Sequence, residues 1–113
     1  MTDKIVVMTT CEAADDADRI ASSLVEKRLA ACVSILPGAT SVYRWKGTVE
    51  RAAEIVVLIK TSRALLARVQ AEVERLHPYE LPEVLALPVM DGSERYLEWL
   101  NQGLLVLEED EER

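Results

Sequence analysis

The hydrophobic pattern of this chain alternates between two periods, which predicts a mixture of strands and helices. Short apolar runs rich in Val and Ile are typical of strands. Four runs are therefore predicted as strands: 5–8, 31–36, 55–59 and 84–89. Residues 9–11 are expected to form the turn that leaves the first strand.

Two longer segments carry apolar residues at helical spacing. The first begins near Ala14, with aspartates at its start and basic residues at its end, as the helix dipole favours. Its apolar face is formed by Ala17, Ile20, Ala21, Leu24 and the stem of Arg28. The second helix is expected to have Ser62 as its N-cap. Its apolar stripe is Leu65, Leu66, Val69, Val73 and Leu76, and the residues predicted outside the stripe are Arg68, Glu72, Glu74 and Arg75.

The second and third strands are predicted to form a long central hairpin. Pro37-Gly38 interrupts the second strand, and Gly47 suits a tip at residues 46–48 because glycine readily takes positive φ. After the fourth strand, a short helix is expected from Ser93 to about Gln102, and 104–107 is expected to form an extra strand.

This order of elements, βαββαβ with a long hairpin, predicts an α+β fold of the ferredoxin-like type. Right-handed crossovers would place both long helices on one face of the sheet. A short internal repeat, Ile5-Val6-Val7 and Ile55-Val56-Val57, supports two β-α-β halves. We expect one domain over residues 1–107 and a disordered acidic tail at 108–113.

The predicted strands do not alternate between apolar and polar residues, although a sheet covered on one side should alternate. The runs 5–8, 55–59 and 84–89 are apolar at nearly every position, and 104–107 is apolar as well. Two helices can cover only one face of such a sheet. The pattern therefore predicts that other copies of the chain cover the second face.

Composition narrows the possible partners and compartment. The net charge is −7, so no basic surface for nucleic acid is expected. No apolar run approaches the roughly 18 residues of a membrane span, and no leader is expected before the first strand. The two cysteines, Cys11 and Cys32, lack CxxC spacing, which favours reduced thiols and a cytoplasmic location.

The stretch 77–83 is the first candidate for chemistry, because it combines the single histidine with carboxylates between two prolines. His77 could bind Cu(II) or Zn(II) with Glu80 or Glu83, or it could end the helix and hydrogen-bond a neighbouring subunit. No catalytic residue is expected. A single histidine forms no persuasive Ser-His-Asp set, and nucleotide-binding glycine motifs are absent.

The cysteines and aromatic residues are further candidates. Cys32 is expected to be a small buried hydrophobe, or alternatively a metal ligand or redox thiol. Cys11 is expected to be exposed in the loop before the first helix, with a lowered pKa, although nearby aspartates oppose its ionisation. Tyr43 and Trp45 share a face of the hairpin, and with Tyr79 they could line a cleft between subunits or anchor the interface.

Four segments in order carry a family resemblance: 30–35, 37–47, 76–83 and 96–100. With Ala30-Ala31-Cys32-Val33, Tyr43-x-Trp45-x-Gly47, His77-Pro78-Tyr79-Glu80-Leu81-Pro82-Glu83 and Tyr96-Leu97-x-Trp99-Leu100, the sequence resembles the CutA family of divalent-cation tolerance proteins.

The resemblance implies a homotrimer that is similar to the PII signalling proteins, without enzymatic activity or a required cofactor. It also implies a response to divalent metal ions such as copper, by weak binding. The candidate metal ligands are His77, Cys11, Cys32 and Glu80, and the candidate residues of the subunit cleft are Tyr43, Trp45, Tyr79 and Glu83. Thr9 and Leu76 stand where some copper-binding members have a cysteine and a second histidine. The alternatives are a trimeric small-molecule sensor and a trimeric interaction scaffold.

Overall fold

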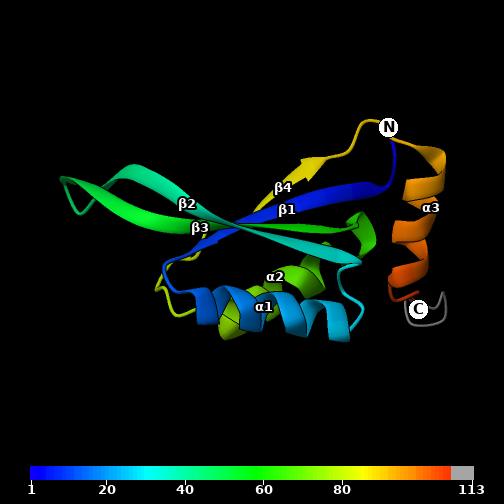
Figure 1. Cartoon of the computed structure of the whole chain (residues 1–113), viewed down its shortest axis with the longest axis horizontal. Helices are drawn as coiled ribbons and strands as arrows, with labels where there is room; N and C mark the ends of the chain where they lie inside the picture. The colour runs from blue at the N-terminus through cyan, green and yellow to red at the C-terminus, as the bar shows by residue number, and fades with distance from the viewer. Residues whose placement is uncertain (108–113) are drawn as a thin grey trace.

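The computed structural model describes residues 1–107, in which four antiparallel strands form one sheet and three α-helices pack around it (Figure 1). The elements are β1 (Lys4–Cys11), α1 (Ala14–Glu26), β2 (Cys32–Trp45), β3 (Thr48–Ser62), a 3-10 turn (Arg63–Leu65), α2 (Leu66–Leu76), β4 (Leu85–Pro88) and α3 (Glu94–Gly103). The strand order is β2-β3-β1-β4. The predicted βαββαβ order is confirmed, while the predicted disordered tail lies outside the described residues.

The core lies between the sheet and the two long helices, α1 and α2, which both cover the same face (Figure 1). Alternate strand residues such as Val7, Val57 and Ile59 point to this side and are fully buried. They pack against the apolar stripes of both helices, whose buried members include Ile20, Leu24, Val69 and Val73. The prediction that both helices share one face is confirmed.

The opposite face of the sheet carries apolar side chains that no helix covers. Leu85 and Leu87 of β4 pair with Met8 and Val6 of β1, so their side chains share this face. Leu85 is 53% exposed and Leu87 is 47% exposed. Within residues 1–107, β4 pairs only with β1, so the connector 77–83 leads to an edge strand. The strand predicted at 84–89 is thus present as β4 and lies at an edge of the sheet.

Strand ends differ from the sequence-based expectation in three places. Residues 9–11 continue β1 instead of forming a turn, because they pair with residues 55–57 of β3. β2 runs through Pro37-Gly38, since a bulge between Leu36 and Ala39 absorbs the two residues. The expected strand at 104–107 is not present in the described chain. The backbone N–H of Leu105 instead donates to the carbonyl oxygen of Arg28 at 2.8 Å.

Helix ends also correct two expectations. Ser62 makes no side-chain cap, and the following Arg63 N–H donates to the carbonyl oxygen of Asp3 at 2.9 Å instead. Arg28 lies beyond the end of α1 with φ +60°, where it forms a left-handed turn and not part of the helical face. Within residues 1–107, none of the helices is long and apolar enough to cross a membrane.

Glu72 lies inside the helical layer, although the pattern placed it on the outer face of α2. It is 7% exposed and accepts a hydrogen bond from Ser23 of α1. Lys27 Nζ lies 2.8 Å and Arg75 Nη2 lies 2.7 Å from its Oε2 atom. A buried carboxylate is tolerated here because donors from both helices surround it.

Candidate functional site

The connector between α2 and β4 begins at His77, which ends α2 as predicted. Its backbone is extended, with φ −78° and ψ 134°, the conformation that a residue before proline favours. The ring is turned inward, so that the residue is only 8% exposed. The ring of Tyr79 packs edge-on against it, with 4.5 Å between the ring centres. His77 therefore fixes the start of the connector.

Both ring nitrogens of His77 make hydrogen bonds within the chain. The backbone N–H of Tyr79 donates to Nδ1 at 3.1 Å, so Nδ1 must present a lone pair. Nε2 then carries the proton and donates to the carbonyl oxygen of Thr10 at 2.7 Å. A metal ion could bind this imidazole only if one of these bonds were released.

Cys11 lies beside His77, with its Sγ atom 3.7 Å from Nε2. It is fully buried, because β1 continues through this position and turns the side chain into the core. Burial, with smaller contributions from Asp16 and Glu54, raises the pKa of the thiol to about 11. The expectation of an exposed cysteine with a lowered pKa is therefore wrong. At neutral pH the group is a thiol and not the thiolate that binds metals.

Cys32 lies at the other end of the sheet. It is partly exposed in the chain and pairs with Lys60 of β3, whereas Cys11 pairs with Ile55. Ile55 and Lys60 are five positions apart along β3, which corresponds to about 17 Å in an extended strand. Within residues 1–107, no three His, Cys, Asp or Glu side chains lie close enough to hold one metal ion. Of the four predicted ligands, only His77 and Cys11 touch.

A cleft of about 560 Å³ lies between the β2–β3 hairpin and the connector. Three aromatic side chains line it, Tyr43 and Trp45 from β2 and Tyr79 from the connector. Four carboxylates also line it, and no Lys or Arg does so in the described part of the chain. The complete lining is Thr10, Glu12, Ser41, Val42, Tyr43, Trp45, Glu54, Tyr79, Glu80, Leu81 and Glu83.

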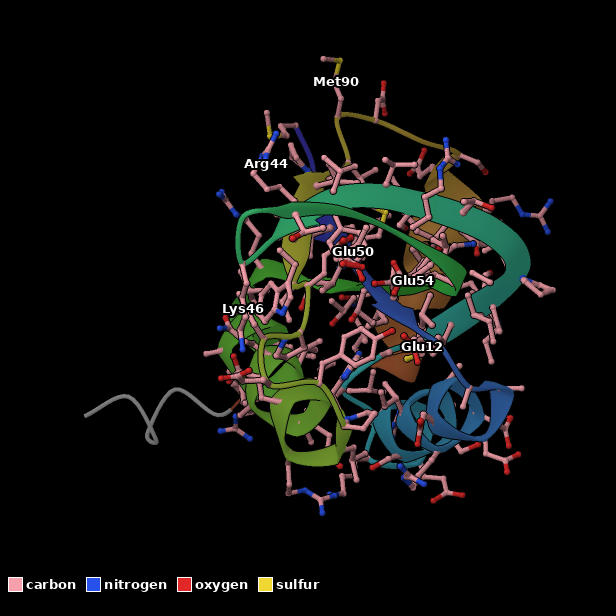
Figure 2. All side chains as sticks on the ribbon, turned by 90° about the vertical axis from the view of Figure 1, so that its left-hand side faces the viewer. Glu12, Arg44, Lys46, Glu50, Glu54 and Met90 are labelled. Atoms are coloured by element: carbon pink, nitrogen blue, oxygen red, sulfur yellow. The ribbon has the colours of Figure 1, made fainter. Side chains whose placement is uncertain are left out.

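All four residues predicted for a subunit cleft therefore line one cleft of a single chain, and Glu80 joins them. Figure 2 looks at the hairpin end of the molecule and shows Glu12 and Glu54 near the centre. Arg44 and Lys46 lie towards one margin of the same view. Neither residue lines the cleft, although Lys46 Nζ lies 5.6 Å from the ring centre of the lining residue Trp45.

Glu54 is the most buried carboxylate of this cleft, at 9% exposed. The hydroxyl of Tyr79 donates to its Oε2 atom at 2.9 Å, while Oε1 accepts no hydrogen bond from any described residue. Burial, and next the bond to Glu54, raise the pKa of Tyr79. Burial and the charge of Glu54 also raise the pKa of Glu83. Burial is the larger cause of both shifts, and the negative charge of Glu54 adds to it.

Sequence reasoning missed Glu12 and Glu54. A signal for Glu54 was present, because a carboxylate directly before the apolar run 55–59 is exceptional in a strand that enters the core. Glu12 gave no such signal. It follows β1 in an exposed position, and the cleft that it lines is completed by hairpin and connector residues distant in sequence.

The sequence matches the family described as CutA1 divalent ion tolerance protein over residues 5–103. The divalent-cation tolerance protein CutA of Thermus thermophilus is 45% identical over 98 residues, which cover 87% of this chain and 95% of that protein. Protein CutA of Mus musculus is 46% identical over 93 residues, which cover 82% of this chain and 52% of the relative.

Solved structures show the same likeness. The divalent cation tolerance protein (Cut A1) from Thermus thermophilus superposes with a TM-score of 0.87 at 44% identity, covering 89% of this chain and 98% of the other. CutA from Xylella fastidiosa superposes with a TM-score of 0.89 at 42% identity, covering 91% of this chain and 99% of the other.

Proposed function

Because this chain belongs to the CutA1 divalent ion tolerance protein family, we propose that it acts as a homotrimer that binds divalent metal ions weakly at its acidic cleft. Its role is divalent-cation tolerance, and the family description and the names of its relatives refer to tolerance and not to a reaction. The observation that carries the metal-binding proposal is the lining of the cleft, which contains four carboxylates and no lysine or arginine of residues 1–107.

A tight copper centre does not fit the residues of one described chain. Both nitrogens of His77 are engaged, and the thiol of Cys11 is buried and protonated. Strong sites use three or four convergent ligands, which the described chain does not assemble. We therefore place the weak site at Glu80 and Glu83 of the connector, which line the cleft. Carboxylate oxygens bind many divalent ions, with Cu(II) generally bound most strongly.

Calorimetric titration of the full chain with Cu(II) tests this proposal. We expect weak saturable binding that falls by about tenfold in Glu80→Gln/Glu83→Gln, because carboxylate oxygens are lost. Glu98→Gln, on the exposed side of α3, is the matched control and should bind as the wild type does. Cys32→Ser and His77→Ala test the other candidate ligands. Absence of saturable binding, or its loss only in His77→Ala, would contradict the carboxylate site.

Support for the trimer comes from the uncovered face of the sheet. Leu85 and Leu87 are about half exposed there, beside Val6 and Met8 of β1. Apolar surface of this kind is typical of protein–protein contacts. The long β2–β3 hairpin, which extends past the helical layer in Figure 1, also carries exposed Val42 and Val49. Copies of the chain could cover both regions.

A second candidate function is a small-molecule sensor, and the aromatic lining of the cleft favours it. The volume of about 560 Å³ falls within the range of ligand pockets, roughly 300–1,000 Å³. A bare metal ion needs neither this volume nor aromatic walls. A ligand that raises the melting temperature when metal ions do not would support the sensor over the metal-binding function.

We also propose a cytoplasmic location. Cys11 and Cys32 are both free thiols, which reducing compartments maintain. Fractionation of cells that express the chain at native levels, followed by immunoblotting, tests this. Recovery in another compartment would overturn it.

A further inference from the structure

The carboxylates of the acidic cleft come from separate elements and do not converge on one point. Glu54 belongs to β3, Glu12 follows β1, and Glu80 and Glu83 belong to the connector. Although all four line the cleft, no three of them are close enough to surround one ion. Such an arrangement suits a ligand whose positive charges are themselves spread out.

Glu54 supplies an acceptor that already faces this space. The residue is nine-tenths buried, and its Oε1 atom has no hydrogen-bond partner among the described residues. Tyr79 holds the carboxylate through Oε2, so Oε1 stays in place. Among the described residues, only Thr9 Oγ1 is fully buried without a partner, so Glu54 Oε1 keeps some access to the cleft. An ammonium group in the cleft would bind this oxygen with a charge-assisted hydrogen bond.

The aromatic walls indicate what connects the positive charges. Tyr43, Trp45 and Tyr79 line the cleft, and aromatic rings attract alkylammonium groups over their faces. The Nζ atom of Lys46 already lies 5.6 Å from the centre of the Trp45 ring, so this ring accepts a cation within the chain itself. Val42 and Leu81 add aliphatic lining that suits methylene groups. A hydrated metal ion gains little from these surfaces, whereas an organic cation gains both charge attraction and apolar burial.

We propose that the cleft binds a linear polyamine, with one ammonium group at Glu54 and the alkyl chain against Tyr43 and Trp45. This rests on the second candidate function above and names the class of its ligand. The remaining carboxylates pair with the other ammonium groups. The ligand carries its charges at intervals, which matches carboxylates that do not converge.

Calorimetry of the full chain with spermidine at physiological salt tests this proposal. We expect saturable binding that weakens by about tenfold in Glu54→Gln, because a charged acceptor is lost. Trp45→Ala should also weaken binding, while the conservative Trp45→Phe retains most of it. Glu26→Gln, an exposed carboxylate at the end of α1, is the control for net charge. Circular dichroism verifies that each variant is folded.

Parallel titrations with Cu(II) and with 1,8-octanediol separate the outcomes. Spermidine binding that depends on Glu54 and Trp45, without binding of the uncharged diol, supports the polyamine site even if Cu(II) does not bind. Cu(II) binding without spermidine binding overturns the polyamine site and leaves the metal-binding proposal standing. If Glu26→Gln weakened spermidine binding as much as Glu54→Gln does, the net charge of the chain and not the cleft would account for binding, and the proposed site would be overturned.

Discussion

At the scale of single residues, His77 has a fixed proton position. Tyr79 N–H donates to Nδ1 and Nε2–H donates to Thr10, so the neutral ring has only one tautomer compatible with both bonds. We expect long-range ¹H–¹⁵N NMR spectra at neutral pH to show a protonated Nε2 and an unprotonated Nδ1. A protonated Nδ1 would contradict this hydrogen-bond assignment.

The same NMR signals can locate a metal ion. Zn(II) is diamagnetic, and binding at the cleft carboxylates should leave both ring nitrogens of His77 nearly unchanged. A large shift of Nδ1 or Nε2 on adding Zn(II) would instead show that the imidazole gives up a hydrogen bond to bind metal.

Cys11 should resist alkylation in the native protein. Its thiol is fully buried and its pKa is raised to about 11, so little reactive thiolate exists at pH 8. We expect peptide mass spectrometry to find Cys11 unmodified by iodoacetamide in buffer and fully modified in urea. Rapid native modification at this peptide would contradict its burial. The raised pKa also means that the stability contributed by the protonated thiol is lost as pH rises from about 9 to about 11.

At the scale of elements, Glu72 links the two helices that cover the sheet. Its bonds to Arg75, and then its interactions with Lys27 and Ser23, hold the pKa of the carboxyl far below its ordinary value of 4.5, against the opposing effect of burial. A lowered pKa stabilises the fold above the unfolded-state pKa, and this stability is lost progressively as pH falls below about 4.5. The contact is therefore a source of acid sensitivity.

Replacing this carboxylate tests its contribution. We expect Glu72→Gln to lower the free energy of unfolding at pH 7 by about 1–3 kcal/mol, because charge-assisted bonds are lost at a buried group. The difference from the wild type should shrink between pH 5 and pH 3. Urea denaturation at fixed protein concentration measures both quantities. Glu74→Gln, exposed on the same helix, should change little, and an equal loss there would argue against a specific role of Glu72.

The sequence predicted the order and type of the main elements because their apolar periods are strong. The ends were less predictable, since they depend on partners distant in the chain. Residues 9–11 remain in β1 because β3 pairs with them. Residues 104–107 form no strand because no strand of the described chain pairs with them. Glu72 was misplaced because its partners Ser23 and Lys27 come from another helix.

The candidate site was partly predictable for the same reason. Alternation placed Tyr43 and Trp45 on one face, and the prolines marked the connector that carries Tyr79 and Glu83. The contribution of Glu54 depends on the hydroxyl of Tyr79 reaching it across 25 positions of sequence, which no local pattern encodes.

At the scale of the whole molecule, the uncovered face of the sheet determines whether copies of the chain assemble. The apolar residues Leu85 and Leu87 are about half exposed on the edge strand β4, where a neighbouring copy could pack against them. If a copy covers this face, a charge placed there would have to be buried without a partner, which opposes association strongly. The proposed trimer can therefore be tested by one substitution on β4.

We expect light scattering at micromolar concentration to give three times the 12.6 kDa chain mass for the wild type. Leu87→Lys should shift the population towards the single-chain mass, since it places an ammonium group on the apolar face. Ala67→Lys introduces the same charge on the exposed surface of α2, away from the sheet, and should remain trimeric. Circular dichroism distinguishes dissociation from unfolding. A wild-type chain that scatters as a monomer would overturn the trimer and leave Leu85 and Leu87 as surface that must be covered by a different partner.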